Sequence, residues 1–130
     1  MFDPLELLEV AGQLGASPAS EKSLRSAINR AYFAIHLKAE LALSLDGVYT
    51  RRGNADDHGG VIAALRGPAR RRQAGEFLDE LRRLRNAADY SLDHPTEPSH
   101  WDDAKRYVAE IRRVLDPDWQ KQGLSTSASL

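Results

Sequence analysis

The sequence of 130 residues contains no cysteine. This absence excludes disulfide scaffolds, cysteine-based zinc sites, iron–sulfur clusters and thiol nucleophiles. Long apolar runs are also missing, because charged residues interrupt every hydrophobic stretch within a few positions, and the sequence therefore predicts no membrane span. Residues 1–4 do not begin a signal peptide, so we expect a cytoplasmic protein.

Several common catalytic motifs are absent as well. The chain has no glycine-rich loop followed by Lys and Ser or Thr, and no serine framed by glycines, so nucleotide-phosphate loops and hydrolase elbows are excluded. The four histidines do not pair at helical spacing, which predicts no metal site. We expect no cofactor. The histidine positions are His36, His58, His94 and His100.

Aromatic residues make up only 7% of the chain and β-branched runs are scarce, whereas Ala, Leu, Arg and Glu are frequent. This composition favours helices over strands. A formal net charge of −1 argues against a uniformly basic nucleic-acid coat. The length fits one domain with a core of its own. The sequence thus predicts a single all-α domain.

Capping residues and apolar spacing set the expected helices of the N-terminal half. Asp3-Pro4-Leu5-Glu6 is typical of a helix start and predicts a helix over residues 4–14. Ser17-Pro18 repeats this start, and apolar residues then recur every three or four positions. The second helix is therefore expected over residues 18–45, with Lys38 as the one polar interruption of its apolar face.

The C-terminal half predicts one short helix and two long ones. The short helix is capped by Asp56 or Asp57 and ends at Gly67-Pro68, and a long helix follows over residues 73–90. Ser99 is expected to cap the last helix, which Asp116-Pro117 should end.

The expected architecture is an up-and-down bundle of four or five helices over residues 1–120, followed by a disordered tail at residues 121–130. The core is predicted from one apolar face on each long helix. Its members are Leu24, Ile28, Ile35, Phe77, Leu81, Leu84, Val108 and Ile111.

Positive charge gathers in the middle of the chain. Residues 51–85 carry nine Lys and Arg against five Asp and Glu. Arg70, Arg71 and Arg72 surround the Gly-Pro break, and Arg82 follows on the next helix, so a phosphate-binding surface is one interpretation. The alternative is that these arginines form an ordinary solvated face.

Two polar stripes follow the helical period. On the helix over 73–90, Arg85 lies about 80° from Phe77, and Asp89 and Arg82 lie about 120° and 140° from it. Arg25, Asn29, Tyr32 and His36 form the stripe on the second helix. If the stripes face each other, they form one polar cluster beside the core; otherwise they are boundary residues satisfied by their neighbours.

Three motifs carry a resemblance to a known family. They are residues 26–36 (Ser-Ala-Ile-Asn-Arg-Ala-Tyr-Phe-Ala-Ile-His), residues 58–62 (His-Gly-Gly-Val-Ile) and residues 85–90 (Arg-Asn-Ala-Ala-Asp-Tyr). In this order they resemble the HEPN superfamily of small prokaryotic helical domains, in the branch with Arg-Ala-Tyr-Phe-Ala and Arg…Ala-Asp-Tyr segments. The resemblance covers roughly residues 20–115 and implies a helical bundle that forms a homodimer.

The resemblance also implies a site. Active members of the family cleave RNA without a metal, using an arginine, the polar residue after it and a histidine a few residues further on. Arg85 and Asn86 match the first two, but Tyr90 stands in the place of the histidine. A tyrosine with a pKa of about 10 donates a hydrogen bond at neutral pH but rarely abstracts a proton. Catalysis is therefore uncertain, and Asp89 or His36 could supply a base only if they converge on Arg85.

The sequence thus predicts a HEPN-like RNA-targeting protein of the toxin or defence type, with a minimal nucleotidyltransferase as a possible partner. A non-catalytic module for dimerisation, partner binding or nucleotide binding is the alternative, and a plain structural bundle is the third. The expected catalytic positions are Arg85, Asn86, Asp89 and Tyr90. The expected RNA-binding or nucleotide-binding positions are Arg30, Tyr32, His36, Arg70, Arg71, Arg72 and Arg82.

Overall fold

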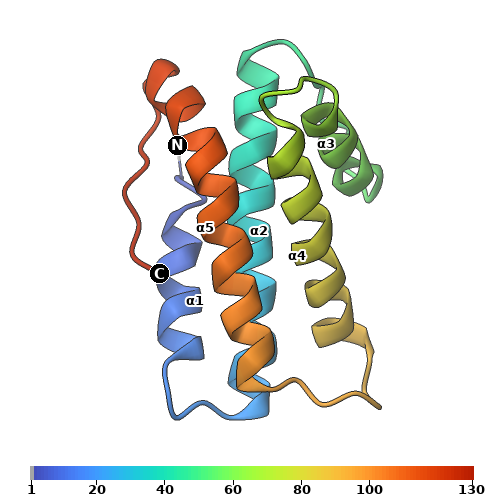
Figure 1. Ribbon diagram of the computed structural model, residues 1–130, viewed down its shortest axis with the longest axis vertical. Helices are drawn as coiled ribbons and strands as arrows, with labels where there is room; N and C mark the ends of the chain where they lie inside the picture. The colour runs from blue at the N-terminus through green and yellow to red at the C-terminus, as the bar shows by residue number, and fades with distance from the viewer. Residues whose placement is uncertain (1) are drawn as a thin grey trace.

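The computed structural model describes residues 2–130, which form five α-helices and no strand (Figure 1). The long helix α2 lies at the centre, and each of the other helices contacts it. The prediction of an all-α bundle is confirmed. The helices are α1 (Glu6–Gly15), α2 (Glu21–Leu45), α3 (Asp56–Arg66), α4 (Arg72–Tyr90) and α5 (Pro98–Lys121).

The core lies between α2, α4 and α5, with α1 closing one side of α2 and α3 packing on α4. Most of the predicted core is buried, but Phe77 and Leu84 are only half-buried and pack at its edge. The predicted face of α4 is thus rotated. The buried row of α4 consists of Ala74, Leu78, Leu81, Arg85 and Ala88.

The predicted starts of α2, α3 and α5 need correction. Helix α3 begins at Asp56 itself, after Ala55, so neither Asp56 nor Asp57 caps it. Helix α2 begins at Glu21, because the Ser20 hydroxyl accepts a hydrogen bond from the Ser23 backbone N–H at 3.2 Å, and Ser17-Pro18 lies in the preceding loop. Helix α5 begins at Pro98 after Glu97, which forms a reciprocal capping box with His100. Ser99 is therefore not the cap.

The end of α5 differs most from the prediction. The helix passes through Asp116-Pro117 and continues to Lys121. A proline removes one backbone hydrogen bond, and the residues that follow hold this turn in place. The indole of Trp119 is fully buried and the carboxylate of Asp118 binds two arginines. Tertiary contacts thus outweigh the local signal to end the helix.

The polar interruption in the apolar face of α2 is Lys38, and an ion pair accounts for its place in the core. Its side chain is buried, and its ammonium group contacts the Asp3 carboxylate at 2.8 Å. The same group lies 5.8 Å from the ring centroid of Trp119. The segment before α1 is therefore fixed to the core by an ion pair as well as by apolar packing.

After α5, residues 124–130 run back along α1 without regular secondary structure (Figure 1). The Arg112 guanidinium donates hydrogen bonds to the carbonyl oxygens of Thr126 and Ala128, at 2.7 and 3.1 Å. In the part of the chain that the structure describes, no helix has the length and apolarity that a membrane crossing requires.

Candidate functional site

The two polar stripes predicted on α2 and α4 do face each other. The Asn29 side-chain amide donates to the Asp89 carboxylate at 2.9 Å, and the Arg85 guanidinium lies 3.5 Å from the same carboxylate. At the end of α4, the Arg25 guanidinium donates to the carbonyl oxygen of Ala88 at 2.7 Å. Residues 60 positions apart in the sequence thus form one connected surface.

Arg85 lies deeper than its predicted place on the flank of α4. Its side chain is buried in line with Leu81 and Ala88. The guanidinium carbon lies 5.0 Å from the ring centroid of Tyr32 and 5.3 Å from that of Phe33. Aromatic rings attract a cation placed over their faces, and this explains how a positive charge is accommodated within the buried row.

Two histidines meet beside Arg85. The rings of His36 on α2 and His58 on α3 stack with centroids 4.6 Å apart, and the Tyr32 hydroxyl forms a hydrogen bond with His58 Nδ1 at 2.5 Å. We refer to Tyr32, His36, His58, Arg82 and Arg85 as the histidine–arginine cluster. His58 is not among the predicted site residues, although it belongs to the His-Gly-Gly motif, which is the one signal for it in the sequence.

The turn that carries His58 is held by its neighbour Asp57. This buried carboxylate accepts hydrogen bonds from the Tyr49 hydroxyl and from the backbone N–H groups of Arg52 and Gly53, the latter two at 2.8 Å. The Tyr49 hydrogen bond and these backbone bonds hold the pKa of Asp57 at about 2. The loop before α3 is therefore fixed at the residue next to His58.

The second glycine of the motif also has a packing role. A Cβ atom on Gly60 would lie 2.7 Å from the Tyr49 ring, so only glycine permits this contact. A Cβ atom on Gly59 would meet the Arg82 Nη1 at 3.9 Å. The first turn of α3 thus lies directly beside the Arg82 guanidinium.

Burial controls the protonation of the cluster. Desolvation, the neighbouring His58 and the two arginines lower the pKa of His36 to about 4. Burial and the same arginines lower the pKa of His58. Burial raises the pKa of the Tyr32 hydroxyl to about 12. At neutral pH both imidazoles are therefore uncharged and Tyr32 keeps its proton.

Several polar atoms of the cluster lack a partner within residues 2–130. They include His36 Nδ1, Arg82 Nε and Arg85 Nε, all of which are shielded from solvent. His36 has one carboxylate nearby, that of Glu40 at 3.7 Å, which in turn pairs with Arg51 at 3.2 Å. Buried polar atoms are normally satisfied, so three unpaired ones in a single cluster distinguish it from an ordinary stabilising network.

The other predicted residues near Arg85 lie at the surface. Asn86 and Arg30 are exposed, and the Tyr90 residue is 72% exposed. Tyr90 does not enter the cluster within one subunit. Arg30 borders a shallow groove of about 300 Å³ together with Arg25, Ser26, Asn29, Ala88 and Asp89.

The arginines of the Gly-Pro break lie elsewhere. Arg71 is buried, and its guanidinium binds the carboxylates of Asp46 and Asp118. Arg70 binds Asp118 at 2.5 Å. We refer to these four residues as the arginine–aspartate network. It lies near the start of α4, roughly 20 Å along the helix from Arg85.

Arg72 also binds within the protein, because its Nε donates to the Arg66 carbonyl oxygen at 3.3 Å. Arg70, Arg71 and Arg72 therefore lie apart from the histidine–arginine cluster, and their hydrogen bonds go to groups of the protein itself. We do not include them in the candidate site.

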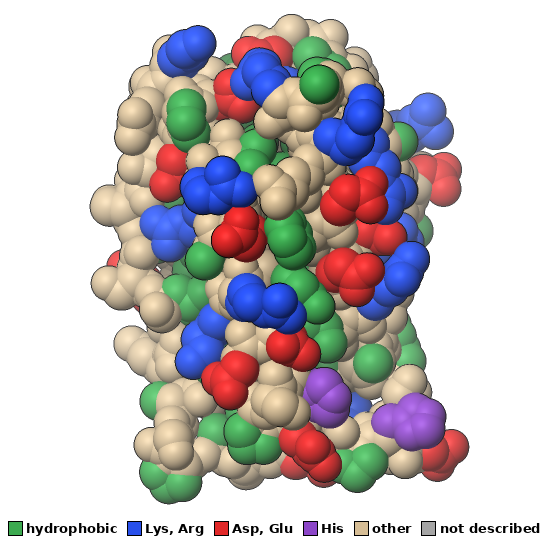
Figure 2. Space-filling view, in the orientation of Figure 1, with side chains coloured by type: hydrophobic (Ala, Val, Ile, Leu, Met, Phe, Trp, Pro, Cys, Tyr) green, Lys and Arg blue, Asp and Glu red, His purple; other side chains and the backbone are tan. Residues whose placement is uncertain are grey.

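The charges on the visible face of the molecule are mixed. Figure 2 shows basic and acidic side chains interspersed on this face, without one continuous basic area. Among the described residues, no group of three or more acidic and histidine side chains is arranged to hold a metal ion. The candidate site is thus distinguished by the side chains that meet in the histidine–arginine cluster and not by a broad area of positive charge.

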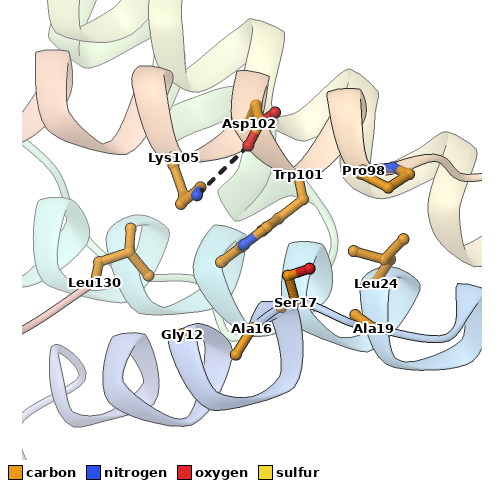
Figure 3. Close-up of a pocket in the computed structure, with 11 residues that line it drawn as sticks. Gly12, Ala16, Ser17, Ala19, Leu24, Pro98, Trp101, Asp102, Lys105 and Leu130 are labelled. Atoms are coloured by element: carbon orange, nitrogen blue, oxygen red, sulfur yellow. Dashed lines mark ion pairs between the residues drawn. The ribbon is translucent and has the colours of Figure 1, made fainter.

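A pocket of about 370 Å³ opens between α1, α2 and α5 (Figure 3). Small residues such as Gly12, Ala16 and Ala19 line it around the Trp101 indole, and Asp102 pairs with Lys105 at its edge. None of the predicted site residues lies there.

Comparison with known proteins finds no matching family model, no matching curated protein and no matching solved structure. The HEPN resemblance therefore rests on the three sequence motifs alone.

Proposed function

We propose that this chain is a HEPN-like protein that binds RNA through the phosphate backbone, with Arg82 and Arg85 as the phosphate-binding residues. The observation that carries the proposal is the convergence of two arginines with two neutral histidines and a tyrosine in one cluster. These residue types come from three helices, and residues on all three helices belong to the motifs that resemble the family.

Charge balance supports a role beyond stability. Asp89 is the one carboxylate within ion-pair distance of Arg85, and Arg82 forms no ion pair within residues 2–130. A planar guanidinium with free donors matches two oxygens of a phosphate better than an ammonium group does. The aromatic ring of Tyr32 holds Arg85 in place while its Nε remains unpaired.

Fluorescence anisotropy with a labelled single-stranded RNA at low salt tests this proposal. We expect Arg82→Ala and Arg85→Ala each to weaken binding by roughly tenfold or more, and Arg85→Lys to restore it only in part. Arg83→Ala is the matched control, because Arg83 is adjacent in sequence but pairs with Asp79 at 3.2 Å on the exposed side of α4.

Two results would contradict the proposal. One is a wild-type protein that binds no RNA at low salt. The other is a loss of affinity in Arg83→Ala as large as in Arg85→Ala, because this would show that general positive charge and not the cluster attracts the RNA. Circular dichroism of each variant controls for folding.

The proposed biological setting is that of a cytoplasmic toxin or defence protein that forms a homodimer and has a minimal nucleotidyltransferase as partner. Exposed apolar side chains near the end of α4 support self-association, since Tyr90 is 72% and Leu92 85% exposed. Light scattering at tens of micromolar should give the dimer mass, and Tyr90→Asp should shift it toward the monomer. A monomeric wild type would remove the dimer from the proposal.

A second candidate function is a non-catalytic module that binds a partner protein or a nucleotide. It is favoured by Tyr90, whose exposed hydroxyl stands where active family members have a histidine. Native mass spectrometry with the candidate partner separates the two functions. A stable complex together with no RNA binding would favour the module.

A further inference from the structure

We propose that the groove between α1 and α5 binds an extended peptide segment of a partner protein, and that residues 124–130 of this chain occupy the groove as an intramolecular competitor. The two helices both pack on α2 and leave this groove between them. The histidine–arginine cluster comes from α2, α3 and α4, so the peptide site is independent of the proposed RNA binding.

The groove has one lining face on each helix. On α1 and on α5, three lining residues follow one another at steps of three and four positions, so each set lies on one side of its helix. The residues are Glu9, Gly12 and Ala16 on α1, and Lys105, Val108 and Arg112 on α5. We refer to the space between these two faces as the tail groove.

Residues 124–130 lie in the tail groove as a bound peptide would. Every second side chain faces the protein, which is typical of an extended chain. The inward-facing residues Leu124, Thr126 and Ala128 are partly buried, whereas the serines between them are exposed. Leu124 and Ala128 also pack against the hydrophobic core. The groove thus already holds one extended segment, and this segment shows which chemistry the groove accepts.

Arg112 holds the backbone of this segment. Its guanidinium donates hydrogen bonds to the carbonyl oxygens of Thr126 and Ala128, at 2.7 and 3.1 Å. Within residues 2–130, the ion pairs of the α5 cations involve Lys105, Arg106 and Arg113, and none involves Arg112. Hydrogen bonds to main-chain oxygens do not depend on the identity of the side chains, so Arg112 can hold another extended segment in the same way.

The segment fills the tail groove incompletely. Open spaces of about 410 Å³ toward α5 and about 480 Å³ toward α1 border Leu130, and this residue stays 39% exposed. A Cβ atom on Gly12 would lie 3.8 Å from the Leu130 Cα, so the segment passes over α1 where the helix has no side chain. Leu130 also borders the pocket around Trp101 (Figure 3). Larger apolar side chains would therefore bury more surface in the groove.

These open spaces define the partner segment. It is extended, with bulky apolar side chains two positions apart in the places of Ala128 and Leu130, and with small polar residues between them. Such a segment makes more apolar contact than residues 124–130, but it must displace a competitor that is attached to α5. A short tether gives this competitor an effective concentration in roughly the millimolar range. The partner segment therefore binds weakly until residues 124–130 leave the groove.

Fluorescence anisotropy of labelled peptides with the full chain tests this site. The first peptide has the sequence of residues 124–130, and the second carries Phe in place of Ala at its fifth position. The full chain with Leu124→Asp and Ala128→Asp, the released variant, should bind the first peptide at least about tenfold more tightly than the wild type does. The matched control is Ser125→Asp with Ser127→Asp, which adds the same charge on the exposed side and should bind like the wild type.

Two further comparisons test how the groove recognises a peptide. Arg112→Ala in the released variant should weaken binding roughly tenfold. Arg113→Ala should leave it unchanged, because Arg113 pairs with Glu110 at 3.1 Å on the exposed side of α5. The second peptide should bind at least about threefold more tightly than the first, since Phe buries more apolar surface than Ala.

The wild-type chain provides a test that needs no substitution. In two-dimensional amide NMR spectra, the unlabelled second peptide at millimolar concentration should move the signals of Thr126 and Leu130 toward their positions in the released variant. Signals that stay in place would overturn the proposal. Equal peptide affinities of the released variant and the wild type, or an unchanged affinity in Arg112→Ala, would overturn it as well. Circular dichroism of each variant confirms that the protein is folded.

Discussion

The protein contains two groups of arginines with opposite surroundings. In the arginine–aspartate network, Arg71 binds two carboxylates and Arg70 shares one of them. In the histidine–arginine cluster, Arg85 shares one carboxylate with Asn29 and lies against aromatic rings. The sequence suggests phosphate binding for both groups, because both are rich in arginine. The comparison shows that the number of carboxylates paired with the arginines, and not the number of arginines, distinguishes a stabilising network from a candidate binding site.

The two regions also differ in how their ionisable groups respond to burial. Burial alone would raise the pKa of Asp118, but its hydrogen bonds to Arg71 and Arg70 lower it below the ordinary value. In the cluster, burial lowers the pKa of His36. His58 and the two arginines lower it further, to about 4. The network is thus satisfied in its charged form, whereas the histidines of the cluster are kept neutral.

The largest effect is expected from breaking the network. Arg71→Ala removes a buried cation and leaves Asp46 and Asp118 without their main partner, so the free energy of unfolding should fall by about 3–5 kcal/mol. Urea unfolding measures this loss. RNA affinity should not change in the fraction that remains folded. Arg70→Ala is the control: its side chain is largely exposed, and it should cost less than about 1 kcal/mol.

The second-largest effect is a loss of stability at low pH, which occurs in a different pH range for each of the two regions. The folded protein binds a proton at His36 only near pH 4, whereas the unfolded chain does so near pH 6.5. Stability should therefore decrease by up to about 3 kcal/mol as the pH falls from 6.5 to 4. The carboxylates of the network have lowered pKa values, so their contribution is lost only below about pH 4.

Urea unfolding of the wild type and of His36→Phe at several pH values checks this assignment. The variant keeps an aromatic ring for stacking but cannot titrate, so the part of the decrease that His36 causes should disappear, while the part from His58, whose pKa is also lowered, should remain. An unchanged pH profile would show that another group is responsible.

A smaller loss is expected at Arg85. Arg85→Ala removes a cation over the Tyr32 ring and a weak ion pair, but Asp89 keeps its hydrogen bond from Asn29. The cost should be about 2 kcal/mol, less than that of Arg71→Ala. Urea unfolding of both variants tests whether Arg85→Ala loses less stability than Arg71→Ala. Equal losses in the two variants would mean that Arg85 is as much a structural residue as Arg71.

The smallest effect is expected from Tyr90→His, which restores the histidine of the family pattern. The Tyr90 side chain is largely exposed, so stability should change by less than about 0.5 kcal/mol. Because position 90 lies outside the cluster, RNA affinity should stay within about twofold of that of the wild type. A large gain in affinity would instead mean that position 90 acts through a partner subunit.

Much of the fold and part of the candidate site could be predicted from the sequence. The two polar stripes could be predicted, because their members lie at helical spacing within α2 and within α4. Spacing within a helix does not show which neighbour a stripe faces, and the Asn29–Asp89 hydrogen bond in the structure decides this point. His58 could not be placed, since the spacing of residues within α3 does not reveal where α3 packs. Arg85 was assigned to the flank because a charged residue counts as polar, whereas its guanidinium packs between aromatic rings.

Local sequence patterns also failed to predict the end of α5, because they do not reveal tertiary contacts. A proline is a local signal to stop a helix, and the sequence offers nothing to set against it. The structure adds the burial of Trp119 and the pairing of Asp118 with Arg71, contacts that join residues 47 positions apart. Interactions of this range decide helix ends that local patterns leave open.

The ion pair between the buried Lys38 and the partly exposed Asp3 makes the survival of the whole protein depend on the segment before α1. If proteolysis removes Asp3, the ammonium group of Lys38 remains in the core without its carboxylate, which is 35 positions away in the sequence. A buried charge that loses its partner is strongly destabilising, and a less stable protein opens more often to further proteolysis. Loss of the segment that carries Asp3 should therefore lead to complete degradation, so that functional copies without it do not accumulate.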